Sequence, residues 1–134
     1  MSINWISKPW GKQRTIHICE RIQIDEFEVL PGGYCTAHYH ETKDNIFIVH
    51  AGDLQVHFLK NAPRPKNHTL VHQWRSCSGS TGAVLVPAGE IHRFVAKEKV
   101  SGIEIYRSLQ SKRVEVDDIV RLEKKGGIDF ARLL

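Results

Sequence analysis

The sequence predicts an all-β fold, a barrel or sandwich built from two antiparallel sheets. Three segments alternate apolar and polar residues with the period of a half-buried strand: Ile22–Ile24, Leu54–Phe58 and Ile103–Ile105. Two short apolar runs, Ile46–Val49 and Ala83–Val86, are typical of strands that are covered on both faces. Turn residues separate these segments at Gly32-Gly33, Ala51-Gly52-Asp53 and Pro87-Ala88-Gly89.

The other segments complete one expected domain over residues 1–134, because the length is close to that of a single domain. Residues 1–12 are expected to form an N-terminal arm. Residues 61–80 hold two prolines and have no clear period, which predicts a surface loop inserted between strands. Over Val116–Lys125, the spacing of the apolar residues after Asp117 and Asp118 predicts a short C-terminal helix.

The composition favours a small anionic ligand. The net charge of +4 is spread along the chain, and the dense basic run with interleaved aromatic residues that would indicate a nucleic-acid partner is missing. We expect no membrane segment, because the chain shows neither a long apolar run nor a signal peptide. Cys19, Cys35 and Cys77 form no paired motif, which favours the reducing cytoplasm.

Three histidines indicate a metal site. His38 and His40 are two residues apart, so on an extended strand both imidazoles leave the same face of the sheet. His92 comes from a distant predicted strand and can complete a set of three neutral nitrogen ligands. Such a set is the minimum for a catalytic metal centre that keeps open positions. The remaining histidines have no comparable spacing.

The order of the motifs resembles the two-part signature of the cupin superfamily. Its segments are Gly32 to Gly52 around His38 and His40, followed by Pro87-x-Gly89-x-x-His92. With Lys8-Pro9-Trp10-Gly11 near the start and Asp117–Glu123 near the end, the chain is similar to the C-terminal cupin module of type II mannose-6-phosphate isomerases. That module is usually fused to a sugar-1-phosphate guanylyltransferase. The resemblance implies a cupin double-stranded β-helix, a jelly-roll-like barrel.

The resemblance also implies the ligand set. Family cupins bind a divalent metal through two His and a Glu of the first motif and a His of the second, and these positions fall on His38, His40, Asn45 and His92. Asn45 departs from the family glutamate. Glu41 and Asp44 are alternatives, but on a regular strand they point the other way. Zinc is the favoured metal, with iron, manganese, cobalt and nickel as alternatives.

For catalysis, the resemblance implies isomerisation of mannose 6-phosphate to fructose 6-phosphate, a reaction of carbohydrate metabolism. Glu104 matches the glutamate of the module's late strand and is the candidate base. Lys43 occupies the position of a family arginine thought to be needed for catalysis, and it keeps the charge without the bidentate fork. Arg93, with Arg107 and Arg121, is available for the substrate phosphate.

Three functions therefore stay open. The first is the metal-dependent sugar-phosphate isomerase. The second is an Fe(II) dioxygenase, since three histidines without a carboxylate resemble the thiol and diketone dioxygenase branch of the cupins. The third is a non-catalytic cupin that binds a sugar or sugar nucleotide, which the departures at Lys43 and Asn45 favour.

The sequence also predicts a homodimer. Ile46 and Ile48 lie on the strand face opposite Asn45 and Phe47, and two apolar faces need a covering layer on each side. A second sheet or another subunit can supply that layer. We expect a homodimer in which the arm Ser2–Gly11 crosses between subunits.

Overall fold

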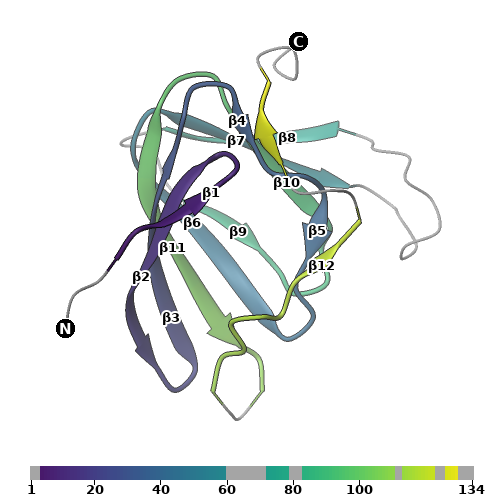
Figure 1. The fold of residues 1–134 in the computed structure, drawn as a ribbon. Helices are drawn as coiled ribbons and strands as arrows, with labels where there is room; N and C mark the ends of the chain where they lie inside the picture. The colour runs from purple at the N-terminus through teal and green to yellow at the C-terminus, as the bar shows by residue number, and fades with distance from the viewer. Residues whose placement is uncertain (1–3, 60–71, 79–82, 111–112, 123–125, 130–134) are drawn as a thin grey trace.

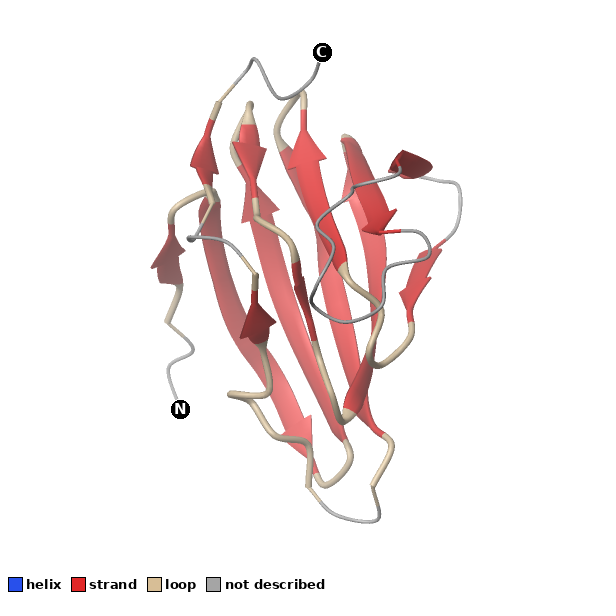
Figure 2. Ribbon diagram, turned by 90° about the vertical axis from the view of Figure 1, so that its right-hand side faces the viewer, coloured by secondary structure: helices blue, strands red, loops and turns tan. Residues whose placement is uncertain are grey.

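Thirteen strands and no helix make up the described part of the chain in a computed structural model (Figures 1 and 2). The structure describes residues 4–59, 72–78, 83–110, 113–122 and 126–129. The strands form two antiparallel sheets that wrap around a common interior. Within the described residues there is no helix long and apolar enough to cross a bilayer.

The first sheet has six strands in the order β1-β2-β3-β11-β6-β9. Their bounds are Ile6–Lys8 (β1), Gly11–Cys19 (β2), Ile22–Val29 (β3), Val100–Ser108 (β11), Lys43–Ala51 (β6) and Ala83–Val86 (β9). Strand β11 lies between β3 and β6 and pairs along its length with both. Alternate residues along these strands therefore point into the interior and away from it, which accounts for the period of two in the sequence.

The second sheet is built around β10, which runs over His92–Ala96. Strand β7 pairs with one edge of β10, and the short strands β4 and β5 pair with the other edge. Strands β8, β12 and β13 pair with β7, β5 and β4 respectively. The bounds are Gly33–Tyr34 (β4), His38–Tyr39 (β5), Asp53–Leu59 (β7), His72–Ser78 (β8), Val120–Arg121 (β12) and Gly127–Ile128 (β13).

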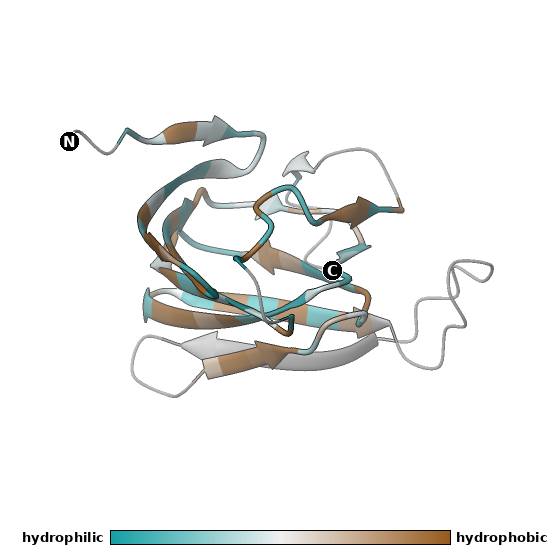
Figure 3. Ribbon diagram, turned by 90° about the horizontal axis from the view of Figure 1, so that it is seen from below, coloured by the Kyte–Doolittle hydropathy of each residue, from teal (hydrophilic) through white to brown (hydrophobic). Residues whose placement is uncertain are grey.

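The core lies between the two sheets. Its main cluster consists of buried apolar side chains from both sheets: Phe27, Val29, Cys35, Phe47, Val49, Leu54, Val56, Phe58, Val84, Val86, Phe94, Ala96 and Val100. Trp10 closes one end of it, with its ring edge-to-face on Phe94 at 5.2 Å between centroids. Figure 3 shows how hydrophobic and hydrophilic residues alternate along the strands that supply this core.

The described part of the predicted C-terminal helix, residues 116–122, is not helical. Residues 117–122 are here named the strap; they begin in a turn and continue into the short strand β12, in which Val120 pairs with Tyr39 of β5. Val120 and Leu122 pack on a second apolar cluster that includes Tyr39 and Ile91. These side chains are two residues apart, which is also the strand period. The spacing of these apolar residues fits both a helix and an extended segment, and burial against β5 favours the extended segment.

Two other predicted segments lie partly outside the described residues. Of the predicted loop 61–80, residues 72–78 form β8, which pairs with β7 over its whole length. Of the predicted arm, β1 folds back on β2 of the same chain, so this part is an edge hairpin of the first sheet. Crossing of the arm to another subunit stays a prediction.

The second sheet covers only the inner face of β6. Asn45 and Phe47 face the interior and are buried, whereas Ile46 and Ile48 lie on the outer face and are partly exposed. The second sheet therefore supplies the covering layer that the sequence predicted for the inner face of β6. The homodimer remains a prediction for the other face.

Candidate metal centre

Two short strands and one tight turn bring the three predicted histidines together. His38 begins β5 and His92 begins β10, and the two residues are direct partners in the register of these strands. Before β10 the chain turns at Gly89, whose φ of 83° favours glycine. The Gly89 amide donates to the His40 carbonyl at 2.6 Å, which fastens the second motif to the first.

The histidine side chains converge in the interior. His38, His40 and His92 are all buried, and one nitrogen of each lies within 4.8 Å of the others. Ring centroids are 4.2 Å apart for His38 and His92, and 5.2 Å apart for His38 and His40. One ion can be held by all three side chains.

The hydrogen bonds of the rings show that the site fits a metal. Each Nδ1 lies 2.7–3.0 Å from a main-chain carbonyl oxygen: that of Thr36 for His38, Asp118 for His40 and Glu90 for His92. A carbonyl only accepts, so each Nδ1 carries the proton and each Nε2 keeps its lone pair. The Nε2 atoms of His40 and His92 are buried without a hydrogen-bond partner among the described residues.

Burial also keeps these imidazoles in the form that binds metals. It lowers the pKa of His38 to about 4 and the pKa of His92 well below its usual value, and the neighbouring histidines lower both further. Burial lowers the pKa of His40 as well. The three rings are therefore neutral near pH 7, and neutral imidazole is the ligating form.

Asn45 lies on the inner face of β6 and is completely buried. Its Nδ2 donates to Oε2 of Glu104 at 2.7 Å. Its Oδ1 has no partner among the described residues, so an oxygen is left over in the position where the family places a carboxylate. Its role as the fourth ligand stays a prediction.

Glu104 is buried on the inner face of β11 and lines the cavity next to the histidines. Burial raises the pKa of Glu104 to about 7, and the nearby Asp25 carboxylate also raises it. Tyr106 and Asn45 hydrogen-bond to Glu104 and oppose the shift. Among the described residues this carboxyl has no ion-pair partner. Its role as base stays a prediction. The position of Glu104 in the cavity is compatible with that role.

The cavity has a volume of about 440 Å³ and opens between the sheets and the strap. Its polar and charged lining residues include His38, His40, Lys43, Glu104, Tyr106 and Arg121. Phe47 and Phe94 supply apolar walls. A chamber of this size and mixed lining suits a small polar molecule.

A polar cluster beside Glu104 was missed by the sequence analysis. Asp25, directly opposite Glu104 in the β3–β11 register, accepts hydrogen bonds from Gln13 (2.6 Å), Thr15 (2.8 Å) and Gln23 (3.0 Å). The signal was available, because Gln23 and Asp25 fall on the strand face that is otherwise apolar. A polar residue on a buried face needs partners, and here they line the cavity.

Lys43 lines the cavity but is engaged by the protein. Its Nζ donates to the carbonyl oxygens of Glu115 (2.8 Å) and Val116 (3.3 Å) and lies over the Tyr106 ring. Burial lowers the pKa of Lys43. The amine fixes the chain that leads into the strap, and its catalytic role stays a prediction.

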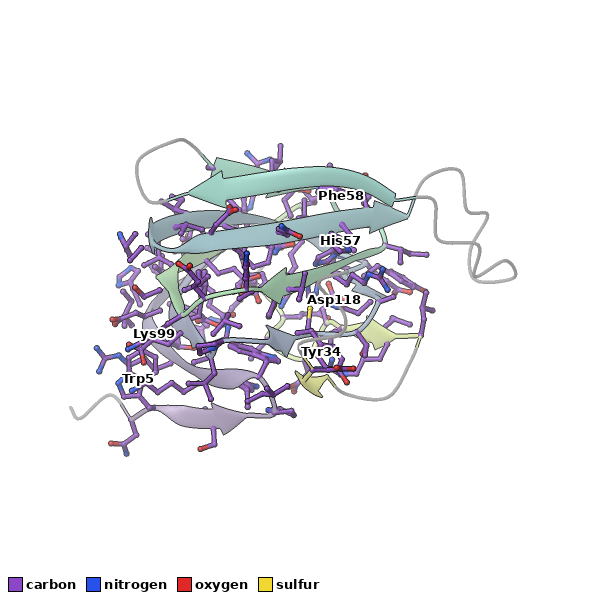
Figure 4. All side chains as sticks on the ribbon, turned by 90° about the horizontal axis from the view of Figure 1, so that it is seen from above. Trp5, Tyr34, His57, Phe58, Lys99 and Asp118 are labelled. Carbon is purple, nitrogen blue, oxygen red and sulfur yellow. The ribbon has the colours of Figure 1, made fainter. Side chains whose placement is uncertain are left out.

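Arg93 is outside the set of residues that line the cavity. It follows His92 on β10, so its side chain leaves the opposite face of the strand, where its Nε donates to His57 at 3.2 Å. His57 lies on β7 (Figure 4). The geometry lends no support to the phosphate-binding role predicted for Arg93, which stays untested. Arg107 pairs with Asp44 at 2.7 Å and also lies outside the lining.

Solved structures share this fold. Similar structures include the capsular polysaccharide assembling protein CapF from Staphylococcus aureus, with a TM-score of 0.72 and 18% identity over 92% of this chain and 32% of that chain. KdgF from Halomonas sp. gives a TM-score of 0.64 and 19% identity over 80% and 87% of the two chains. Oxalate decarboxylase from Bacillus subtilis gives 0.67 and 12% over 90% and 30%.

The fold is that of a cupin, as the sequence predicted, and the three predicted histidines lie together in it. Residues 3–124 match the family described as mannose-6-phosphate isomerase C-terminal, and the chain belongs to that family. It spans about a third of the length of CapF. A comparison with curated protein sequences gave no match.

Proposed function

We propose that this protein is a metal-dependent sugar-phosphate isomerase that converts mannose 6-phosphate to fructose 6-phosphate. The observation that carries the proposal is the position of Glu104, a buried carboxyl without an ion-pair partner in the described part of the chain. It lines the same cavity as His38 and His40, two of the three clustered, metal-ready histidines. Isomerisation of an aldose needs a base for the proton at C2 and an electrophile for the oxygens at C1 and C2. Family membership points to the same reaction.

His38, His40 and His92 would hold the ion, with Oδ1 of Asn45 available as a fourth donor. A divalent metal bound there would supply Lewis-acid polarisation of the sugar oxygens. Zinc suits three neutral imidazoles. Manganese is the second metal to test, because a structural neighbour, the oxalate decarboxylase of Bacillus subtilis, has Mn(II) centres.

Glu104 would carry the proton. As a carboxylate it takes the proton from C2 of the aldose, and as a carboxylic acid it returns this proton to C1. The hydroxyl proton on O2 moves to O1 in the same conversion, so that C2 becomes the carbonyl carbon of the ketose. A pKa of about 7 lets the same group accept and release a proton near neutral pH. Tyr106 and Asn45, which hydrogen-bond to the carboxyl, fix its direction.

The test is a coupled assay that detects fructose 6-phosphate formed from mannose 6-phosphate by zinc- or manganese-loaded protein. We expect turnover in the wild type and a loss of about a hundredfold or more in Glu104→Gln, with substrate binding retained. Binding of mannose 6-phosphate without turnover under every metal would overturn the isomerase and favour a non-catalytic sugar-binding or sugar-nucleotide-binding cupin.

A second candidate is an Fe(II) dioxygenase. The observation that favours it is that the metal-capable group in the described residues consists of three histidines without a carboxylate. Anaerobic loading with Fe(II), followed by oxygen uptake in the presence of thiol and diketone substrates, separates it from the isomerase. Substrate-dependent oxygen uptake without sugar-phosphate turnover would select this candidate.

A further inference from the structure

The strap has two faces with different tasks. Its odd-numbered residues Asp117, Ile119 and Arg121 line the cavity. Its even-numbered residues attach it to the protein, Val120 and Leu122 by packing on the second apolar cluster. One face of the strap therefore points at the site while the other holds the strap in place.

Hydrogen bonds fix the backbone of the strap on both sides of Ile119. The Asp118 carboxylate accepts from the amides of Glu41 (2.9 Å) and Thr42 (2.7 Å) and from the Thr42 hydroxyl (2.7 Å). Further along, the Leu122 amide donates to the Ala37 carbonyl at 3.0 Å. The start of the Arg121 side chain is thus held in place.

Arg121 lies beside the metal-ready histidines. It is the direct partner of His38 in the β12–β5 register, and directly opposed residues of an antiparallel pair extend from the same face of the sheet. Its positive charge contributes to lowering the pKa of both His38 and His40. Arg121 therefore lines the same cavity as the imidazole rings of His38 and His40.

Among the cationic side chains that line the cavity, Arg121 is available to bind a ligand, whereas Arg14 and Lys43 are engaged by other groups of the protein. Arg14 forms an ion pair with Glu26 at 2.7 Å, and Lys43 donates to carbonyl oxygens. Arg121 forms no ion pair with any described carboxylate, including Asp117 on its own face. Lys8 also lacks an ion pair among these residues, but it lies on β1, in the other sheet from His38 and His92.

We infer that Arg121 binds the anionic group of the ligand, a phosphate monoester, while the sugar end of the ligand lies at the histidines. The assignment of the sugar end rests on the proposed function. An unpaired guanidinium offers two parallel N–H donors, which match two oxygens of a phosphate. The phosphate site is then built by the strap and not by the arginine that follows His92.

Isothermal titration with mannose 6-phosphate and with mannose tests the inference on the full chain, both metal-free and zinc-loaded. The metal-free arm removes direct binding of phosphate to the ion. We expect the wild type to prefer the phosphorylated sugar, and Arg121→Gln to lose about 10- to 100-fold in affinity for it, with mannose unaffected. Arg121→Lys should fall in between, because it keeps the charge and loses the fork.

Arg93→Gln is the matched control, since it removes the same charge from β10, in the same sheet but outside the cavity. It should bind both sugars as the wild type does. An unchanged preference in Arg121→Gln, a loss of equal size in Arg93→Gln, or a wild type without preference for the phosphorylated sugar would each overturn the inference. Arg121-dependent binding without turnover would instead overturn the isomerase and leave the phosphate site standing.

Discussion

Asn45 donates a hydrogen bond of 2.7 Å from its side-chain amide to Oε2 of Glu104, across the pair β6 and β11. This contact gives a physical reason for the departure from the family glutamate. A carboxylate at position 45 would face the Glu104 carboxylate in a buried site, where two like charges are costly. The amide instead supplies a donor to Glu104 and an oxygen to the interior.

Replacing Asn45 with glutamate should therefore have opposite effects on the two forms of the protein. We expect Asn45→Glu to bind zinc about tenfold more tightly or better, since a charged ligand is restored. Without metal, the variant should be less stable than the wild type by about 1–3 kcal/mol near neutral pH, because two carboxyls then compete for protons. Chelator competition and denaturation in EDTA measure the two effects. Unchanged zinc affinity would show that position 45 does not point at the ion.

Zinc should stabilise the wild type by binding the folded chain. We expect the unfolding temperature to fall when EDTA is added, and His92→Gln to abolish this dependence on metal. His57→Gln is a control, because His57 is a buried histidine outside the cluster. A metal-dependent shift of equal size in His92→Gln would contradict the three-histidine site.

The pKa of Glu104 predicts a particular pH dependence of stability. Its folded value of about 7 lies above its usual 4.5, so between these values the folded state binds more protons and stability falls as pH rises. Glu104→Gln removes this penalty and should gain on the order of 3 kcal/mol on the wild type between acid and neutral pH in the metal-free protein. Urea denaturation at several pH values checks this. The histidines contribute equally to the pH dependence of both proteins, so the difference between the two curves reports Glu104 alone. If the free energies of unfolding of the wild type and Glu104→Gln ran parallel with pH, Glu104 would not be a buried carboxylate with a raised pKa.

Removing the Asp118 carboxylate should loosen the strap. Asp118→Ala deletes the acceptor of three hydrogen bonds from residues 41 and 42, and we expect a loss of about 2 kcal/mol in the free energy of unfolding. Zinc affinity should fall about tenfold, because the Asp118 carbonyl orients His40. Asp117→Ala is the control, because Asp117 is the exposed neighbour of Asp118. We expect it to change neither the free energy of unfolding nor the zinc affinity by much. Equal effects of the two variants would contradict this role.

Cys19 and Cys35 should differ in reactivity. Cys19 is exposed, whereas Cys35 is buried, accepts a hydrogen bond from the Phe94 amide, and has a pKa that burial raises to about 12. Iodoacetamide should modify Cys19 in the folded protein and leave Cys35 unmodified until guanidinium unfolds the chain. Peptide mass mapping reads out both sites. Early labelling of Cys35 would indicate that the interior opens readily.

The histidine centre could be predicted from the sequence because it depends on local spacing, two residues for His38 and His40 and a glycine turn before His92. For the cluster around Asp25, polar residues on a strand face signalled that partners were needed, but the sequence could not say which. Gln13 and Thr15 come from β2 and Glu104 from β11, and only the register brings them together. The strap was predicted as a helix because the apolar residues of 117–122 fit both periods, and contact with β5 decides the outcome.

The hydrogen bond from His40 Nδ1 to the Asp118 carbonyl joins residues separated by 78 positions. Contacts between residues so far apart require the closure of a long loop, which slows folding and places such contacts late in the order of events. A chain emerging from the ribosome exposes His38 and His40 long before Asp118 has been synthesised. Competence to hold a metal with an oriented His40 is therefore acquired only after Asp118 has been synthesised and has reached His40, so metal uptake reports that the strap has docked.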